Sequence, residues 1–487
     1  MSEDEHRVAR QDPGPLLHRT AELATEFLRG LPDRPVRVDH NAASLRATLC
    51  VPLPEEGEDP IRVIERLARD ADPGIVSMAG PRYFGFVIGG AVPAAVAADW
   101  LTSTWDQNAG VYVGGPAASV VEEAVGGWLI DLFGLPHDTS FGLVTGCQMA
   151  HFSCLAAARQ AVLERLGWDV TGDGLFGAPR VEVIVGAEAH ATIYAALQYL
   201  GLGRDRVHIV PADQQGRMRA NAFREKLASI PPDRPVIVCL QAGNIDTGGF
   251  DPIGELTDAA HARDGTWVHI DGAFGLWARV SPTTAPMLEG VERADSWATD
   301  AHKWLNAPYD SGFALVANPR AHARALSPPH APYLEYASAQ ERDEVHWVPE
   351  FSRRARGFTV YAALRSLGRS GIREMVERGC WVARRIASCL SEASDVDVLS
   401  EVVLNQALIR FRTPDGDQAA SDALTRDVVR EVQEEGTIWL SATVWHGHTA
   451  MRISVSNWGT GADEAEVAVD AILRAADRAR QRLITAP

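Results

Sequence analysis

The amino-acid sequence predicts an α/β protein with a mostly parallel central sheet, helices on both faces of that sheet, and a smaller C-terminal α+β domain. Between residues 141 and 316, short apolar runs alternate with segments of helical length, as in parallel sheets covered on both faces. After about residue 370, longer helical segments alternate with further strands. A chain of 487 residues also exceeds the usual size of one domain. We therefore expect an N-terminal helical arm at residues 1–90, a large domain at 91–370 and a small domain at 371–487.

In the N-terminal part of the chain, the sequence pattern predicts helices only. Apolar side chains recur at helical spacing from residue 15 to 31 and again from 60 to 69, and we interpret these segments as a structural arm. Obligate dimers commonly exchange such arms across their interface. Residues 81–90 are rich in aromatic residues and glycine, which is typical either of a pocket lining or of a filled core. Two more helices are expected at residues 93–104 and 117–133.

The central part of the chain supplies the strands of the expected sheet. Strands are expected near residues 181–185, 208–210, 236–240, 267–270, 296–299 and 313–316, and helices near 149–165, 192–200, 221–230 and 253–263. The stretch from 317 to about 351 is expected to be irregular, and such long irregular segments are usually lids or disordered. In the small domain we expect helices at residues 372–390, 419–435 and 464–483, and strands at 402–412, 437–443 and 450–456.

Composition and charge exclude several classes of protein. The formal net charge of -18 opposes non-specific binding to nucleic acid, which needs a basic face. The six cysteines are scattered without metal-like spacing, as expected in a reducing compartment. The N-terminus lacks the features of a signal peptide, and the most apolar run, residues 86–98, is too short to span a membrane. We expect a cytoplasmic protein without a metal, a nucleic-acid partner or a membrane partner.

Two residues of the central region suggest chemistry. Lys303 lies between an apolar run and a Trp-Leu pair, so its stem is expected to be partly buried, and a lysine held there beside His302 loses its proton more easily. Thirty-two residues earlier, Asp271 ends an expected strand. Alone, a strand-end aspartate is usually a turn former, and most lysines are solvated. Their order and spacing together favour a pyridoxal 5'-phosphate site, where a lysine binds the cofactor and an aspartate keeps the pyridine nitrogen protonated.

Two further segments add expected contacts to that cofactor. Gly146, Cys147 and Gln148 form a turn between an apolar strand and a helix, which aims backbone N–H groups and the positive end of a helix dipole at one point, as a phosphate requires. His190 follows the expected strand 181–185, and a side chain at the carboxyl end of a parallel strand points into the crevice where ligands bind. Without its companions His190 would be a cap or a core residue; with them, an imidazole stacked on the cofactor ring is the better interpretation.

Together these segments resemble the group II pyridoxal-phosphate-dependent amino-acid decarboxylases, which include the glutamate, aspartate, aromatic amino-acid, histidine and cysteine-sulfinate decarboxylases. The resemblance covers roughly residues 75–460 and rests above all on His190, Asp271-Gly-Ala273 and Asp300-Ala-His-Lys-Trp-Leu305. It implies a fold type I enzyme, pyridoxal 5'-phosphate as cofactor, a homodimer with active sites at the subunit interface, and α-decarboxylation of an L-amino acid to its amine.

The resemblance also implies roles for individual residues. Lys303 matches the lysine that binds the cofactor as a Schiff base, Asp271 the partner of the pyridine nitrogen, and His190 the histidine stacked on the ring. Arg452 matches the arginine that receives the substrate α-carboxylate. Cys147 and Gln148 depart from the Gly-Gly-Ser/Thr that the family usually has, so the side-chain contact to the phosphate differs. The residues expected to bind the cofactor are Gly146, Cys147, Gln148, His190, Asp271, Ala273, Asp300, His302 and Lys303.

One departure bears on the reaction. The family usually has a loop tyrosine, a few residues before a Trp-x-x-Pro, that protonates the carbanion left when CO2 leaves. In this sequence Glu344 takes that position, counted back from Trp347, and Glu344 or His346 is expected to donate the proton, with Tyr333 or Tyr336 as alternatives if the register shifts. The missing tyrosine keeps open another reaction on the same scaffold, namely aldol-type cleavage or decarboxylation coupled to oxidation to an aldehyde. A non-catalytic regulator that binds the cofactor is a further alternative, although the sequence supplies no DNA-binding module.

The substrate is the least determined part of the prediction. Tyr83, Phe84, Trp105 and Asn108 are candidates for the side-chain pocket, together with Arg452 for the carboxylate. The aromatic residues among them favour an aromatic or apolar substrate.

Overall fold

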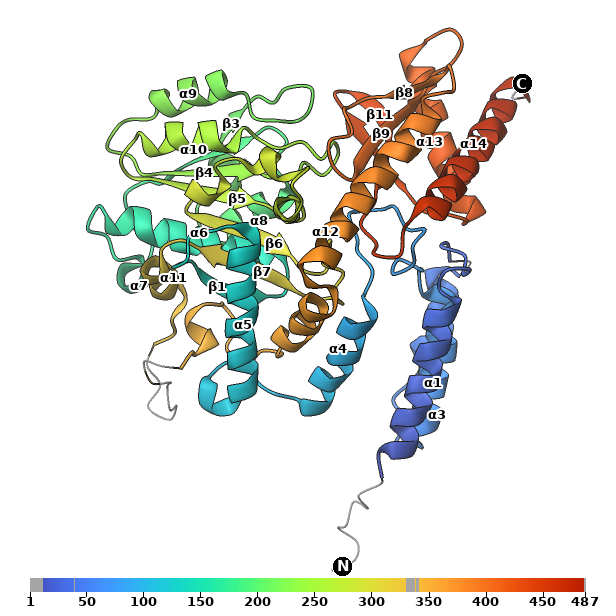
Figure 1. Ribbon diagram of the computed structural model, residues 1–487, viewed down its shortest axis with the longest axis horizontal. Coiled ribbons are helices and arrows are strands. Elements are labelled where there is room, and N and C mark those ends of the chain that lie inside the picture. Colours follow the sequence, from blue (N-terminus) through green and yellow to red (C-terminus); the bar gives the residue numbers. More distant parts are fainter. Residues whose placement is uncertain (1–11, 39, 330–337, 339–340, 486–487) are drawn as a thin grey trace, which may run out of the picture.

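The computed structural model describes residues 12–38, 40–329, 338 and 341–485. Its larger sheet has seven strands in the order β1-β7-β6-β5-β4-β2-β3 (Figure 1). The strands are β1 (Ser140–Val144), β2 (Glu182–Gly186), β3 (His208–Val210), β4 (Val236–Gln241), β5 (Thr266–Asp271), β6 (Ser296–Asp300) and β7 (Gly312–Val316). Strands β3, β2, β4, β5 and β6 pair in parallel, whereas β7 pairs antiparallel to both β6 and β1. The mostly parallel sheet that the sequence predicts is therefore confirmed.

The larger sheet is covered on both faces. Along β4, Val236, Val238 and Leu240 belong to one apolar core, whereas Ile237 and Cys239 belong to another. Successive side chains of a strand point to opposite faces, so these two cores lie on the two sides of the sheet. The helices of this part are α5 (Pro116–Phe133), α6 (Cys147–Glu164), α7 (Val170–Asp173), α8 (Ala191–Tyr199), α9 (Ala220–Ser229), α10 (Ile253–His261) and α11 (Pro319–Leu326).

A second sheet follows in the C-terminal part of the chain. It is antiparallel, has the order β10-β11-β9-β8, and packs with three helices around a separate core. Its elements are α12 (Gly357–Leu390), β8 (Val396–Val398), β9 (Gln406–Phe411), α13 (Gln418–Glu435), β10 (Ser441–Trp445), β11 (His448–Ser454) and α14 (Ala462–Thr485). Helix α12 is kinked at Gly368, where φ is 61°. This kink supports our proposal that the large and small domains meet near residue 370.

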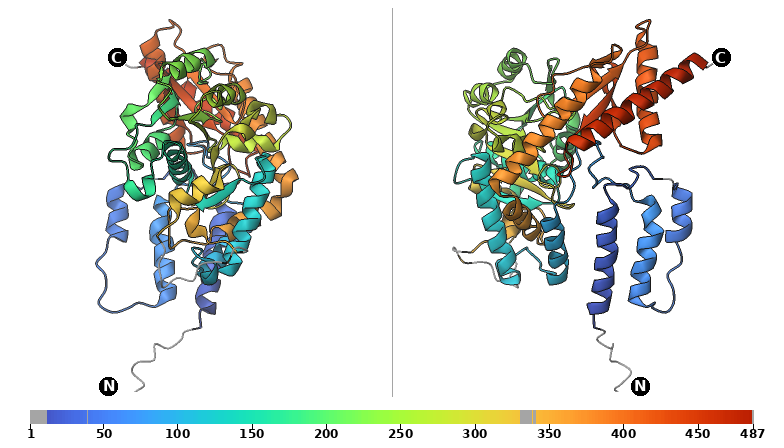
Figure 2. Two further views of the ribbon diagram at one scale, coloured as in Figure 1. Left: turned by 90° about the vertical axis from the view of Figure 1, so that its left-hand side faces the viewer. Right: turned by 45° about the vertical axis from the view of Figure 1, so that its right-hand side comes forward.

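The N-terminal helices project away from the rest of the molecule (Figures 1 and 2). They are α1 (Gly14–Gly30), α2 (Ala42–Leu49) and α3 (Pro60–Ala71), and α4 (Pro93–Trp105) follows against the large domain. None of the side chains of α1, α2 or α3 is buried in this chain. Among the described helices, none combines the length and the apolar character that crossing a membrane requires.

Three expectations about the fold need correction. The stretch 317–351 is not wholly irregular, because its residues 319–326 form α11, with the Asn318 side chain capping the first turn and Pro319 at the first helical position. The sequence analysis also missed α2 and the short strand β8. Residues 83–90, placed in the arm, leave it instead: Phe84 is buried in the core of the C-terminal sheet.

Candidate active site

A cavity of about 250 Å³ opens where the parallel strands end. The residues that line it come from the ends of β4, β5 and β6 and from the starts of α6 and α8. Ligands bind at this edge in open α/β sheets. The lining residues are Gly146, Cys147, Gln148, His190, Thr192, Gln241, Gly243, Ile245, Asp271, Ala273, Phe274, Asp300, His302 and Lys303. All nine residues expected to bind the cofactor are among them.

Lys303 places its amine beside a carboxylate in this cavity. The Nζ atom lies 3.3 Å from Asp300 Oδ2 and 6.0 Å from the centre of the Phe274 ring. Burial lowers the pKa of Lys303, but the nearby carboxylates, Asp300 above all, raise it by more, so the pKa lies above the ordinary value. The expectation that this lysine loses its proton easily is therefore wrong for the free protein. The sequence analysis counted the apolar neighbours and did not count Asp300 as a charge partner.

The start of α6 already holds an anionic group. The backbone N–H of Cys147 donates a hydrogen bond of 2.6 Å to Asp300 Oδ1, at the positive end of an 18-residue helix. Glycine at 146 permits this approach, because a Cβ there would lie 3.1 Å from His302 Cε1 and 3.5 Å from Asp300 Oδ1. His302 accepts a hydrogen bond at Nδ1 from the Ser311 backbone and has its Nε2 3.5 Å from Asp300 Oδ1.

His190 follows β2, caps α8 and lines the cavity at the same edge of the sheet. Its Nδ1 accepts from the Thr192 backbone N–H at 3.4 Å and lies 2.8 Å from the Thr192 hydroxyl oxygen. A neutral imidazole that accepts at Nδ1 carries its hydrogen on Nε2. Burial lowers the pKa of His190, and the cations of Lys303 and Arg452 lower it further although Asp271 opposes them. The ring is therefore a neutral, oriented surface at the cavity wall.

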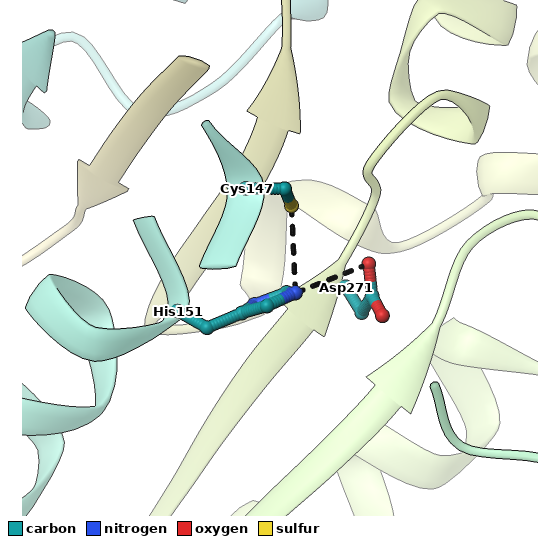
Figure 3. A group of neighbouring side chains, drawn as sticks. All are labelled: Cys147, His151 and Asp271. Carbon is teal, nitrogen blue, oxygen red and sulfur yellow. Dashed lines mark hydrogen bonds and ion pairs between the residues drawn. The ribbon is translucent and has the colours of Figure 1, made fainter. Parts of the chain in front are cut away.

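Asp271 ends β5 with a largely buried carboxylate. Its Oδ1 accepts from the Ala273 backbone N–H at 3.2 Å and lies 3.5 Å from His151 Nε2 (Figure 3). Cys147 Sγ lies 3.4 Å from the same nitrogen, so a sulfur, a nitrogen and an oxygen gather within 4.8 Å of one another. Sequence analysis assigned His151 no role. Its only signal was a position four residues after Cys147, which puts both on one face of α6.

The donor set fits pyridoxal 5'-phosphate. A primary amine, a buried carboxylate, a neutral imidazole and a helix N-terminus converge on one cavity, and each matches a different part of that molecule: the aldehyde carbon, the ring nitrogen, the ring face and the phosphate. The Gln148 side chain adds an amide donor at the helix start.

The proposed proton donors lie elsewhere. Glu344 is in the short 3₁₀ helix Glu344–His346, with its side chain 1% exposed and its Oε1 3.6 Å from Arg342 Nε. Burial raises the pKa of Glu344 to about 7, with Glu122 acting in the same direction. His346 Nδ1 lies 3.0 Å from Ser327 Oγ. Neither residue lines the cavity of its own chain. Tyr333 and Tyr336 lie outside the described residues.

None of the candidate side-chain-pocket residues Tyr83, Phe84, Trp105 and Asn108 lines the cavity. The Tyr83 ring stacks on Trp439 at 4.9 Å, and Asn108 accepts a hydrogen bond from the Arg353 backbone at 3.0 Å. Phe84 belongs to the core of the C-terminal sheet, so it is a core residue rather than a pocket residue. Trp105 packs edge-on against Phe358.

Arg452 approaches the cavity from the C-terminal sheet. It lies on β11, and its guanidinium Nη1 is 3.4 Å from Asp246 Oδ1. Asp246 follows Ile245, which lines the cavity, and Arg452 is close enough to lower the pKa of His190. Both partners are largely buried, so this ion pair joins the two sheets at the edge of the site.

The chain is similar in sequence and in fold to several known proteins. Residues 43–413 match the family model described as the pyridoxal-dependent decarboxylase conserved domain. An aromatic-L-amino-acid decarboxylase of Bacillus atrophaeus is 26% identical over 94% of both chains. The crystal structure of Oryza sativa TDC with PLP and tryptamine superposes with a TM-score of 0.90 at 21% identity, covering 97% of this chain and 99% of that one. Rhodiola rosea 4-hydroxyphenylacetaldehyde synthase superposes with a TM-score of 0.85 at 21% identity, covering 96% and 99%.

Proposed function

Since the chain belongs to the pyridoxal-dependent decarboxylase family, an enzyme family that removes CO2 from amino acids, we propose that its substrate is an aromatic L-amino acid. The observation that carries this proposal is a group of partly exposed aromatic side chains, one of which stacks on a residue that lines the cavity. Tyr309 stacks on the His302 ring at 4.3 Å and remains 56% exposed. Phe86 packs on Trp439 at 5.0 Å and remains 52% exposed.

The path of the backbone supports this assignment. Residues 83–90 run directly against the lysine loop, because a Cβ at Gly89 would collide with the carbonyl oxygen of Lys303. Exposed aromatic rings near a largely buried amine form a surface on which an aromatic side chain can stack. The relative from Bacillus atrophaeus, named for aromatic amino acids, supports the same substrate class.

We assign the residue roles from the geometry of the cavity. The cofactor, when bound, supplies an electron-withdrawing ring that accommodates the charge left at Cα as CO2 leaves. Lys303 would hold it covalently through Nζ, and Asp271 would keep the proton on its ring nitrogen. His190 would cover one ring face, and Arg452 would receive the substrate α-carboxylate in exchange for Asp246. Ordered groups of this kind act by orienting the reacting bond and by excluding water.

The last step of the reaction requires a proton donor to Cα. We retain Glu344 and His346 as proposed donors, and either would have to leave its present contacts to reach a substrate. If no acid reaches Cα, dissolved O2 could instead oxidise the decarboxylated substrate with water, giving an aldehyde, ammonia and hydrogen peroxide. One protein of similar fold is named as an aldehyde synthase.

The experiment is mass spectrometry of the products after the cofactor-loaded protein is incubated with aromatic L-amino acids, with aliphatic and acidic ones as comparison. We expect aromatic amines, each lighter than its parent by CO2. Products from the acidic or aliphatic amino acids alone would overturn the substrate class. An aromatic aldehyde would replace simple decarboxylation with the oxidative alternative.

We also propose that the protein is a homodimer in the cytoplasm. The arm supports the first part: a hollow of about 1210 Å³ lies between α1, α3 and α4 and is lined by partly exposed apolar residues, including Leu28, Leu67 and Trp100. A second copy of the chain would bury this surface. The six unpaired cysteines support a reducing compartment.

A further inference from the structure

A row of buried side chains leads from Asp271 into the sheet. His151 Nε2 lies 3.5 Å from Asp271 Oδ1, and His151 Nδ1 lies 2.9 Å from His269 Nε2. His269 Nδ1 lies 2.9 Å from Ser296 Oγ, which also accepts a hydrogen bond of 2.9 Å from Trp267 Nε1. The two imidazole rings and the serine are fully buried.

The secondary structure explains why these groups meet. Trp267, His269 and Asp271 alternate along β5, so their side chains share one face of the sheet. Ser296 is the register partner of His269 on β6. Helix α6 packs on the same face, so that its residue His151 lies between His269 and Asp271.

The two ends of the row fix the direction of its hydrogens. Trp267 Nε1 can only donate, and the Asp271 carboxylate can only accept. Four contacts separate these ends, and four hydrogens are available: one each from Trp267, Ser296, His269 and His151. All four contacts are satisfied only if Ser296 donates to His269 Nδ1, His269 Nε2 donates to His151 Nδ1, and His151 Nε2 donates to Asp271.

The opposite direction leaves one contact without a hydrogen. If His269 Nδ1 donated to Ser296, His151 Nδ1 would donate to His269, and the His151 Nε2 lone pair would face the Asp271 carboxylate with the Cys147 thiol, 3.4 Å away, as its one neighbouring donor among the contacts described. Burial lowers the pKa of His151 to about 3 and that of His269 well below its ordinary value, so each ring carries a single hydrogen at neutral pH. At the cavity end of this hydrogen-bond relay, His151 lies between Cys147 and Asp271 (Figure 3).

We propose that His151, with its tautomer set by His269 and Ser296, is a positioning residue that holds Asp271 ionised and oriented toward the cofactor ring nitrogen. Among the described residues, the hydrogen bond from the Ala273 N–H and the 3.5 Å approach of His151 Nε2 both involve Oδ1. This leaves Oδ2 as the oxygen for the ring nitrogen. A hydrogen bond to the charged form of a carboxylate favours that form, and so favours a proton on the ring nitrogen rather than on Asp271. The inference rests on the proposed role of Asp271.

The first test uses the protein without cofactor. In ¹⁵N-histidine NMR spectra we expect both rings to carry hydrogen on Nε2 only and not to titrate between about pH 6 and 8. The signals are assigned by their loss in His151→Gln and His269→Gln. Ser296→Ala removes the donor to His269 Nδ1 and is expected to mix the two tautomers of both rings. An imidazolium, or hydrogen on His151 Nδ1 in the unmodified protein, would overturn the relay.

The second test uses pyridoxal 5'-phosphate labelled with ¹⁵N in the ring. His151→Leu is expected to weaken cofactor binding about tenfold or more and to move the ring-nitrogen signal toward the unprotonated form. His151→Gln, whose amide can donate from the position of Nε2, should restore both toward the unmodified values. Unchanged affinity and ring-nitrogen signal in His151→Leu would overturn the proposal.

A matched control separates this role from a structural one. His322 is equally buried and contacts a serine in the same way, with its Nδ1 2.9 Å from Ser140 Oγ, but it does not line the cavity. His322→Leu should leave the ring-nitrogen signal unchanged. Asp271→Asn tests the assumption beneath the proposal: if it also leaves that signal unchanged, the role of Asp271 is wrong, whereas the relay seen without cofactor still stands.

Discussion

At the scale of single residues, three carboxylate contacts occupy the positions where we expect the cofactor and the substrate to bind. The Lys303 amine contacts Asp300, Asp300 also accepts from the start of α6, and Arg452 contacts Asp246. Each pair places a carboxylate where a negatively charged group of the cofactor or the substrate is expected to bind. Binding therefore exchanges one anion for another, which keeps the buried cations paired in both states.

Lys303→Ala should abolish covalent binding of the cofactor. The cavity has no other primary amine among its lining residues, so no neighbour can replace Nζ. We expect loss of turnover and loss of cofactor-dependent mass in the intact protein after denaturation and reduction. Retention of either property would remove Lys303 from the proposed role.

Asp300→Asn should make the free protein take up its cofactor faster at neutral pH. The pKa of Lys303 is raised in spite of burial mainly because of Asp300, so removing this charge lowers the pKa and increases the unprotonated fraction that reacts. Each unit of pKa corresponds to about a tenfold change in that fraction. The rate is followed by the absorbance of the bound cofactor as a function of pH. A rate profile that stays in place or moves to higher pH would contradict this assignment.

At the scale of secondary-structure elements, prediction from sequence succeeded where periodicity was strong. The strand expected at residues 236–240 is β4, which ends one residue later, and α9 begins and ends one residue before its expected bounds. The buried strands β4 to β6 read as short apolar runs bounded by polar turns, which is the strongest local signal of a parallel sheet. Asp271 ends β5 and His190 follows β2, and both line the cavity at the edge where these strands end.

The elements that sequence analysis missed are short or depend on tertiary contacts. Helix α2 has eight residues and β8 has three, too few for a period to emerge. Asn318 and Pro319 are typical of the start of a helix, and they do begin α11. The sequence analysis nevertheless expected an irregular segment there, because the residues that follow up to 351 show no helical periodicity. The relay from Asp271 to Trp267 joins α6 to β5 and β6, so no spacing along the chain could reveal it.

Glu344→Gln should flatten the dependence of stability on pH. The folded protein holds a proton on Glu344 up to about pH 7, whereas the unfolded chain releases it near the ordinary value. A raised folded-state pKa gives stability that is fully present below the unfolded pKa and is lost as pH rises through the folded value. A shift of this size corresponds to about 3 kcal/mol.

Thermal unfolding between about pH 5 and 8 measures this effect. The unmodified protein should lose more stability over that range than Glu344→Gln does. The exposed Glu341, three residues earlier, provides the control, because Glu341→Gln should keep the unmodified dependence. Parallel curves for the unmodified protein and Glu344→Gln would show that Glu344 ionises in the folded state as it does in water.

At the scale of the whole molecule, residues 83–90 lie between the C-terminal sheet and the loop that carries Lys303. Residues 83–90 connect the arm to the site: Phe84 is buried under the C-terminal sheet, and Gly89 touches the Lys303 carbonyl. Sequence analysis placed these residues in the arm because helical periodicity ends before them and no strand pattern begins. Their position is determined by packing against Trp439, which is 356 residues away from Tyr83 along the chain.

The exposed apolar face of the arm leads to a prediction about the oligomeric state. Leu28 and Leu67 are 44% and 55% exposed in the single chain, and both line the hollow between the arm and α4. If a second copy buries this face, the double substitution Leu28→Glu and Leu67→Glu places two carboxylates in an apolar interface. Losing two buried leucines alone amounts to about 3 kcal/mol or more, which is about a hundredfold in the dissociation constant. Sedimentation velocity should find the unmodified protein at twice its 52.7 kDa mass and the variant partly as a monomer at low concentration.

Phe176→Glu, which changes a fully exposed aromatic residue outside the hollow, should remain dimeric. An unmodified monomer, or a variant that dimerises as tightly as the unmodified protein, would mean that this face serves another purpose.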